Sequence, residues 1–143
     1  MSKEVGNRRY MKGQRDAFRL VSGVFHQRDV KMLSVLMEKS CHKGRAGAIR
    51  LALRHARAVS VNDPQATAMA KKVLAEAAWD SPERLNLARN SVRVPVHLEY
   101  QDNDIMEELK VRWGFGSFGQ VLRFAVRYAA EQALQGLPQT DCP

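Results

Sequence analysis

The sequence is poor in cysteine, in aromatic residues and in long apolar runs. Phe, Trp and Tyr make up 7% of the 143 residues, which leaves few rings to stack on the bases of single-stranded RNA. No apolar run approaches the ~20 residues that a membrane-spanning helix needs. The polar, basic N-terminus also lacks the apolar core of a signal peptide. These absences disfavour a membrane-spanning protein, a secreted protein and, more weakly, an RNA-binding protein.

The two cysteines, Cys41 and Cys142, lie far apart in the sequence. Because no secretion signal is recognisable, we expect free thiols in a reducing cytoplasm. Cys41 and His42 could form one pair of zinc ligands, but no second pair stands at the spacing of a zinc site. The sequence therefore predicts a cytoplasmic protein that binds neither a metal nor a cofactor.

Positive charge is abundant and is concentrated in the N-terminal part of the chain. The formal net charge is +8 and the sequence pI is about 9.9, a balance that favours a polyanionic partner, with nucleic acid ahead of an acidic membrane surface. Residues 1–57 hold fourteen Lys/Arg against four Asp/Glu, a net charge of +10. Residues 58–143 hold nine against eleven, a net charge of −2. Non-specific affinity for nucleic acid should therefore come from the N-terminal part.

The stretch from Ser91 to Glu131 has the clearest pattern in the chain. Apolar residues alternate with polar ones over 92–98, which is typical of a half-buried strand. Helical spacing follows, first over 105–113 and then over 118–129. Gly114 separates the two helical patterns, and Ser117 can cap the second helix. One strand and two helices are too few to bury their own apolar faces, so this module should need a partner.

An earlier stretch repeats this pattern. Residues 29–56 align without a gap on residues 102–129 at an offset of 73, and IRLALRHA falls on LRFAVRYA with both arginines and both alanines coinciding. The strand before the first copy, AFRLVSGVF, alternates poorly. The offset directs Arg19 into the core, whereas a shift of one residue directs it outward, because a one-residue slip reverses every side chain. The sequence leaves these two registers open.

The repeat divides the chain into five segments. We expect a basic flexible arm over 1–16, a first copy over 17–58, a helical connector over 59–90, a second copy over 91–134 and a loose tail over 135–143. Within the connector, Asp63 is the predicted N-cap of a helix and Pro64 its first residue. The predicted fold class is mainly α with short β-strands.

The order of elements over 91–131, with its alternating strand, Gly-containing turn and GSFGQVLRFAVRYA segment, resembles the ribbon-helix-helix superfamily of Arc and MetJ type. The resemblance implies an antiparallel ribbon, built from one strand of each copy, that lies in the major groove of double-stranded DNA. It also implies that the outward side chains of the ribbon contact bases, which makes Arg93, His97 and, with an undecided register, Arg19 the candidates. Pro95, between Arg93 and His97, weakens the strand pattern because it cannot donate a ladder hydrogen bond.

Phosphate contacts are predicted from the start of each second helix and from the basic arm. A helix N-terminus can hold a phosphate through its free N–H groups and its dipole. The candidate phosphate-binding residues are Arg8, Arg9, Lys12, Arg15, Lys43, Gly44, Arg45, Gly116 and Ser117.

No pattern predicts an enzyme. The glycines over 114–119 match the G-x-G-x-x-G motif, but a helix precedes them and no second strand with an acidic residue follows. The superfamily resemblance implies a repressor or an accessory protein at a plasmid transfer origin. An alternative is a protein-interaction or dimerisation module, with a toxin or a nuclease as partner and incidental nucleic-acid affinity. The predicted assembly is a homo-oligomer or an intramolecular pseudo-dimer.

Overall fold

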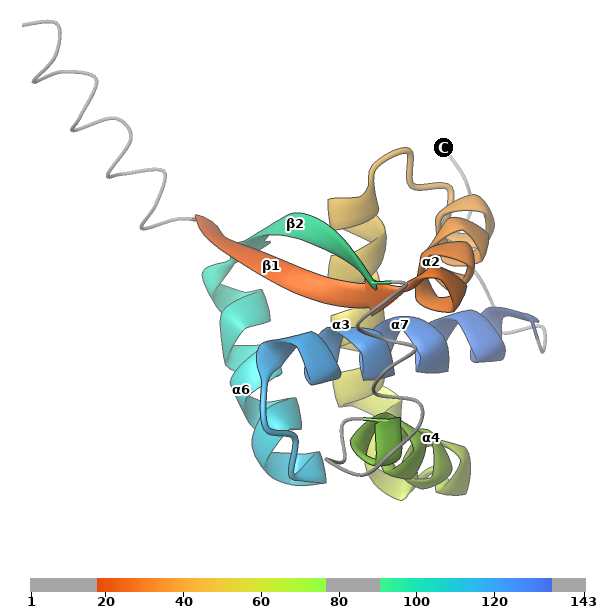
Figure 1. The fold of residues 1–143 in the computed structure, drawn as a ribbon, viewed down its shortest axis with the longest axis vertical. Coiled ribbons are helices and arrows are strands. Elements are labelled where there is room, and N and C mark those ends of the chain that lie inside the picture. The colour runs from red at the N-terminus through yellow and green to blue at the C-terminus, as the bar shows by residue number, and fades with distance from the viewer. Residues whose placement is uncertain (1–17, 77–90, 135–143) are drawn as a thin grey trace, which may run out of the picture.

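The chain folds into helices arranged around a two-stranded antiparallel sheet (Figure 1). The computed structural model describes residues 18–76 and 91–134, without the side chains of residues 18–24 and 97. The elements are β1 (Phe18–His26), α2 (Gln27–Ser40), α3 (Arg45–Val59), the 3₁₀ turn η1 (Ser60–Asn62), α4 (Pro64–Glu76), β2 (Ser91–Glu99), α6 (Tyr100–Trp113) and α7 (Phe118–Leu134). The prediction of a mainly α protein with short strands is confirmed.

The order strand, helix, helix occurs twice, and the two units keep the same spacing. Strands β1 and β2 each have 9 residues, and helices α2 and α6 each have 14. Helices α3 and α7 begin at residues 45 and 118. Each element of the first unit therefore begins 73 residues before its equivalent, which is the offset that aligns the sequence with itself.

The two strands pair with each other in a symmetric register. Phe18 lies opposite Glu99, and His26 lies opposite Ser91. At the centre Ser22 lies opposite Pro95. Pro95 is also the residue that corresponds to Ser22 at the offset of 73. The two units are thus joined at one ribbon, about whose centre the pairing is symmetric.

One face of the ribbon is packed and the other is open. In β2 the side chains of Val94, Val96 and Leu98 are fully buried, whereas Arg93 and Pro95 are exposed. Strand β2 contacts α3 and strand β1 contacts α7, and these two helices cross each other on one side of the ribbon (Figure 1). This confirms the period of two that the sequence of 92–98 indicates.

The pairing also decides between the two registers left open for β1. Phe25 is fully buried and lies opposite Val92. Arg19 lies opposite Leu98, whose side chain is buried, and residues opposite each other in an antiparallel pair belong to the same face of a sheet. The observed register is the one given by the offset of 73, without the shift of one residue. The side chain of Arg19 itself lies outside the described part of the structure.

The core forms where α3 and α7 cross. Ile49 and Leu53 of α3, with Leu122 and Val126 of α7, are fully buried. Helix α4 begins at Pro64 behind Asp63, whose carboxylate accepts the N–H of Gln65, so the predicted cap is confirmed. Helix α4 packs on α7. None of the helices within 18–76 and 91–134 has the length and apolarity needed to cross a bilayer.

The first helices of the two units end alike, with a residue in the left-handed conformation. This residue is Gly114 at the end of α6, with φ of 72°, and Cys41 at the end of α2, with φ of 61°. Cys41 is joined in a disulfide, so the prediction of a free thiol at this position is wrong. Its sulfur partner lies outside the described residues.

Candidate nucleic-acid interface

The open face of the ribbon carries one described cation. Arg93 is exposed on β2, between exposed Ser91 and Pro95. Within 18–76 and 91–134 its guanidinium forms no ion pair. The neighbouring outward position by strand alternation is His97, whose backbone pairs with Leu20 and whose side chain is not among those described. A guanidinium is chemically suited to this position because its donors match the O6 and N7 acceptors of guanine.

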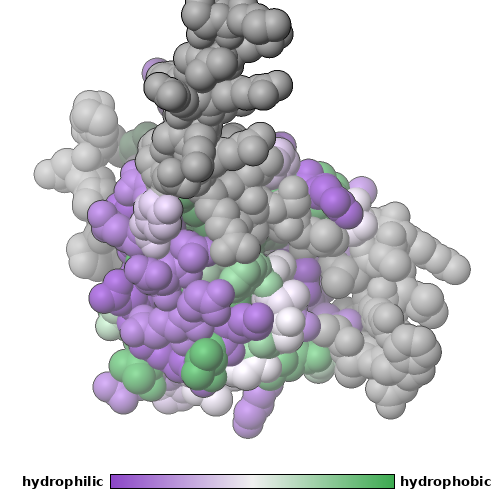
Figure 2. All heavy atoms as spheres, turned by 90° about the vertical axis from the view of Figure 1, so that its left-hand side faces the viewer, coloured by the Kyte–Doolittle hydropathy of each residue, from purple (hydrophilic) through white to green (hydrophobic). Residues whose placement is uncertain are grey.

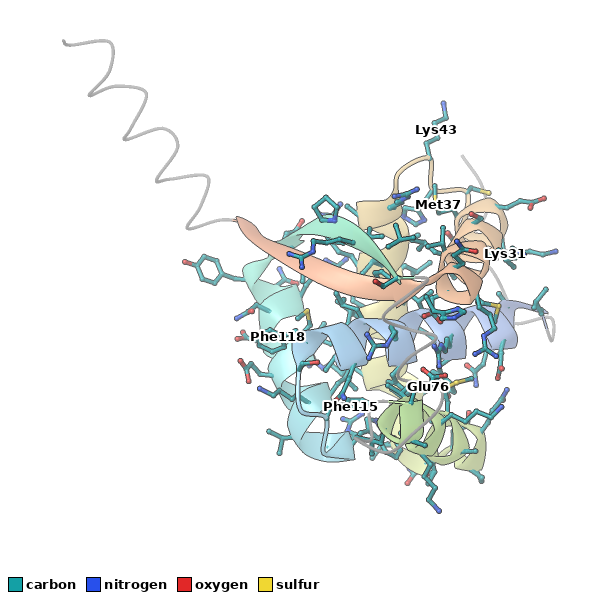
Figure 3. All side chains as sticks on the ribbon, viewed as in Figure 1. Lys31, Met37, Lys43, Glu76, Phe115 and Phe118 are labelled. Carbon is teal, nitrogen blue, oxygen red and sulfur yellow. The ribbon has the colours of Figure 1, made fainter. Side chains whose placement is uncertain are left out.

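The start of α3 is open and basic. Its N-cap is Gly44, in an extended conformation, and no side chain caps the helix. No acidic residue lies in the first turn, and a Cβ built on Gly44 would meet no atom within 4 Å. Lys43 and Arg45 are both exposed, and neither forms an ion pair in the described ranges. Figure 3 shows Lys43 pointing away from the body of the molecule.

This helix start is electrostatically incomplete. The first N–H groups of a helix have no acceptor within the helix, and the helix dipole adds partial positive charge there. Two cations beside it are mildly unfavourable unless an anion is close. The arrangement of Lys43, Gly44 and Arg45 therefore suits a phosphate group.

The equivalent start of α7 satisfies its own donors. The Oγ of Ser117 accepts the N–H of Gln120 at 3.4 Å. The Oε1 of Gln120 accepts the N–H of Gly116 at 2.6 Å, and Gln120 is buried. A phosphate could reach the N–H of Gly116 only by displacing this amide. The predicted phosphate-binding residues Gly116 and Ser117 therefore lie at a capped helix start, whereas Gly44 lies at a helix start without a side-chain cap.

Two arginine–aspartate pairs cross from one unit to the other and hold the ribbon on its helices. Arg127 of α7 donates to both carboxylate oxygens of Asp29 at the start of α2. Its equivalent, Arg54 of α3, donates to Asp102 at the start of α6 at 3.1 Å. Each aspartate also accepts a backbone N–H at the end of its own strand, from His26 and from Glu99. These pairs fix the direction in which each strand runs into its helix.

The two pairs differ in burial because α4 covers one of them. Glu76, at the end of α4, accepts two further hydrogen bonds from Arg127, at 2.7 and 2.9 Å. The Arg127 side chain is 8% exposed, whereas that of Arg54 is 49% exposed. Burial disfavours the charge of Arg127, but the hydrogen bonds that Arg127 donates to Asp29 and Glu76, together with the charges of these two carboxylates, outweigh burial and raise the pKa of Arg127.

The sequence patterns missed these buried pairs, although a signal was present. Arg127 and Arg54 interrupt the apolar stripes of their helices at the same place in the repeat, as do Asp29 and Asp102. A charged residue that recurs at equivalent positions of two helices that pack together indicates a partner across the interface.

The basic arm and possible metal ligands add no described residue to this interface. Arg8, Arg9, Lys12 and Arg15 lie outside the described residues. No group of three His, Cys, Asp or Glu side chains in the described ranges could hold a metal ion. No protein-family model, curated protein or solved structure matches this chain.

Proposed function

We propose that this protein binds double-stranded DNA in the manner of the ribbon-helix-helix superfamily, with the open face of the ribbon in the major groove. The observation that carries the proposal is the ribbon itself, an antiparallel pair of equivalent strands with one face packed on α3 and α7 and the other open. A two-stranded ribbon has the width that the major groove admits. The two copies act as an intramolecular pseudo-dimer in this proposal.

Base recognition is assigned to Arg93 and His97 of β2. Arg93 is exposed on the open face and has no ion-pair partner among the described residues, so its guanidinium is available to a guanine edge. Arg19 is not included, because its backbone lies opposite buried Leu98. In this proposal β1 contributes its backbone to the ribbon that fills the groove, and no base-contacting side chain is assigned to it.

Phosphate contacts are assigned to Lys43, Gly44 and Arg45, with the arginines and lysine of the basic arm extending them. The uncapped start of α3 supports this assignment because its N–H groups and side chains match the charge of a phosphate. The self-capped start of α7 supports a weaker contribution from Gly116 and Ser117. The DNA is therefore anchored mainly on the side of the first unit.

The superfamily resemblance suggests two uses, repression of transcription and assistance at a plasmid transfer or partition site. A protein-interaction module is the second candidate. It is favoured by the near-neutral second unit, where α6 exposes Asp104, Glu107 and Glu108. In that case DNA affinity would reside only in the first unit and would show no sequence preference.

The test is selection of binding sites from a random duplex library with the full chain at about 150 mM salt, where non-specific contacts are already weakened. Enrichment of a motif is the expected result. Affinity without any enriched motif, collapsing as salt rises, would contradict base recognition and favour the second candidate.

Two single-residue variants sharpen the test. Arg93→Lys keeps the positive charge but removes the two-pronged donor geometry of the guanidinium. It should lower affinity for the selected site by about tenfold, since a bidentate base contact contributes about 1–3 kcal/mol, and leave random duplex binding unchanged. Arg57→Lys, an exposed arginine paired with Glu108 on α3, is the matched control and should change neither.

A further inference from the structure

Helices α2 and α6 are equivalent in the fold but carry opposite charge on their exposed faces. The exposed charged residues of α2 are Arg28, Lys31 and Lys39, with Glu38 as the one carboxylate. Those of α6 are Asp104, Glu107 and Glu108. At the offset of 73, Lys31 corresponds to Asp104. The same backbone position is thus a cation on one helix and a carboxylate on the other.

Two of the exposed carboxylates of α6 belong to a continuous stripe with an apolar residue at each end. Tyr100, Asp104, Glu107 and Val111 follow one another at helical spacing on one face. Tyr100 is 61% exposed and Val111 is 81% exposed. Asp104 and Glu107 form no ion pair with any residue in 18–76 or 91–134, whereas Glu108 is paired with Arg57 and Arg112. Figure 2, which views the molecule from the side of α6, shows a mainly hydrophilic surface with isolated hydrophobic residues.

The exposed stripe of α2 is its complement. Lys31, Val35 and Lys39 lie on one face at helical spacing, with the half-buried Val35 between the two lysines. Neither lysine has an ion-pair partner in the described part of the chain. The stripe therefore offers two exposed cations on either side of Val35, where α6 offers two exposed carboxylates and two exposed apolar side chains.

We propose that the α2 stripe of one molecule docks on the α6 stripe of a second copy of this chain. The two helices lie at opposite ends of the ribbon (Figure 1), so one copy can be engaged on both sides at once. A contact between two different patches of the same chain is heterologous, and it produces a row or a ring instead of a closed dimer. The contact does not depend on DNA, and on DNA it would align neighbouring copies head to tail.

Charge complementarity is the reason why a second copy of this chain is proposed as the partner of each stripe. Contact between two α2 stripes would oppose lysine to lysine, and contact between two α6 stripes would oppose carboxylate to carboxylate. Only the α2–α6 combination brings Lys31 and Lys39 to Asp104 and Glu107. The net charge of +8 repels whole molecules, but at about 0.1 M salt the Debye length is only about 10 Å. Contacts at ion-pair distance survive that screening better than the repulsion between molecular centres does.

The experiment measures self-association of the full chain by sedimentation at about 0.1 M and about 1 M salt, which differ roughly threefold in Debye length. The wild-type chain should sediment faster as its concentration rises at the lower salt, and this should vanish at the higher salt. Reversing α2 with Lys31→Glu and Lys39→Glu should weaken association at least about tenfold, the combined effect of two ion pairs. Reversing α6 with Asp104→Lys and Glu107→Lys should do the same.

The decisive sample is an equimolar mixture of the two reversed chains, because both stripes are negative in one chain and positive in the other. Neither should associate alone, and the mixture should associate as the wild type does, which also shows that both variants are folded. The matched control for the α2 reversal is Lys71→Glu with Lys72→Glu on α4, which makes the same change of net charge at exposed residues elsewhere and should leave association intact. A wild-type chain that stays monomeric at 0.1 M salt, or a mixture that fails to associate, overturns the proposal. None of these outcomes depends on whether DNA is bound.

Discussion

The two strand-helix-helix units have the same backbone plan and different surfaces. Residues that are identical at the offset of 73, such as Asp29 with Asp102 and Ala52 with Ala125, lie where the units pack on each other. A position at which the charge is reversed, Lys31 with Asp104, lies on the outside. The comparison teaches that the inner positions set the fold, while each outer position is free to serve one unit alone. The differences are therefore where function should be sought.

The largest expected effect concerns the two arginine–aspartate pairs. Arg127→Met removes the charge that neutralises two buried carboxylates and should lower the free energy of unfolding by about 3–5 kcal/mol. Arg54→Met breaks the equivalent pair, but Arg54 is half exposed and water can replace it around Asp102 and Glu99. Its effect should be about 1.5–3 kcal/mol at most, the range for a charged hydrogen bond.

Urea unfolding of both variants measures this difference, and methionine keeps most of the side-chain volume so that loss of charge dominates. Equal losses in the two variants would mean that the cover provided by α4 and Glu76 contributes nothing, and that the two units are energetically alike.

The next effect separates stability from DNA binding at the open helix start. Gly44→Asp supplies the missing cap of α3 and an anion at its N-terminus, where a Cβ meets no neighbour. It should raise the free energy of unfolding by about 0.5–1 kcal/mol. The same carboxylate would repel a bound phosphate, so affinity for duplex DNA should fall by about tenfold, the equivalent of one lost charged contact. Titration of labelled duplex and urea unfolding give the two numbers; unchanged DNA affinity would remove this helix start from the interface.

The equivalent change in the second unit should behave in the opposite way. Ser117→Ala removes a cap that the structure uses, because its Oγ accepts the N–H of Gln120. Stability should fall by about 1 kcal/mol, as is typical for loss of an N-cap, while DNA affinity should fall much less than it does for Gly44→Asp. Thermal unfolding and the same duplex titration test it. A loss of DNA affinity larger than the loss measured for Gly44→Asp would transfer the phosphate site to α7.

The repeat, the helices and β2 could be predicted from the sequence, because they depend on a periodicity that is present within each segment. The register of β1 was not predictable. Gly23 and Ser22 weaken its alternation, and the position of Arg19 opposite Leu98 is set by pairing with β2, 79 residues further along the chain (98 − 19). The contacts of Glu76 with Arg127 were equally out of reach, since they depend on how α4 lies on α7. Local pattern determines elements, whereas partners across the core emerge only when both units are assembled.

The smallest expected effect concerns a hydrogen-bond network that joins α7 to Asp63. Tyr128 and Gln132 of α7 donate to Asp63 at 2.5 and 2.8 Å, and Asp63 also accepts the N–H of Gln65. The residue equivalent to Tyr128 is His55, which packs beside its ring. The hydrogen bond from Tyr128, followed by that from Gln65, lowers the pKa of Asp63 although burial opposes the shift.

A carboxylate whose pKa is lower in the folded than in the unfolded chain stabilises the fold above its unfolded pKa, and this stabilisation is lost as pH falls through the folded pKa. Asp63→Asn keeps an oxygen that can accept the N–H of Gln65 but cannot titrate, so its free energy of unfolding should fall less steeply below about pH 4, near the ordinary carboxyl pKa. Urea midpoints at pH 7, 4 and 3 measure the slope. Asp104→Asn, at an exposed carboxylate on α6, is the control for the loss of one carboxylate charge. If Asp63→Asn keeps the wild-type slope, the contact between Tyr128 and Asp63 does not discriminate between the protonated and ionised carboxyl, and the network is no more than packing between the connector and the second unit.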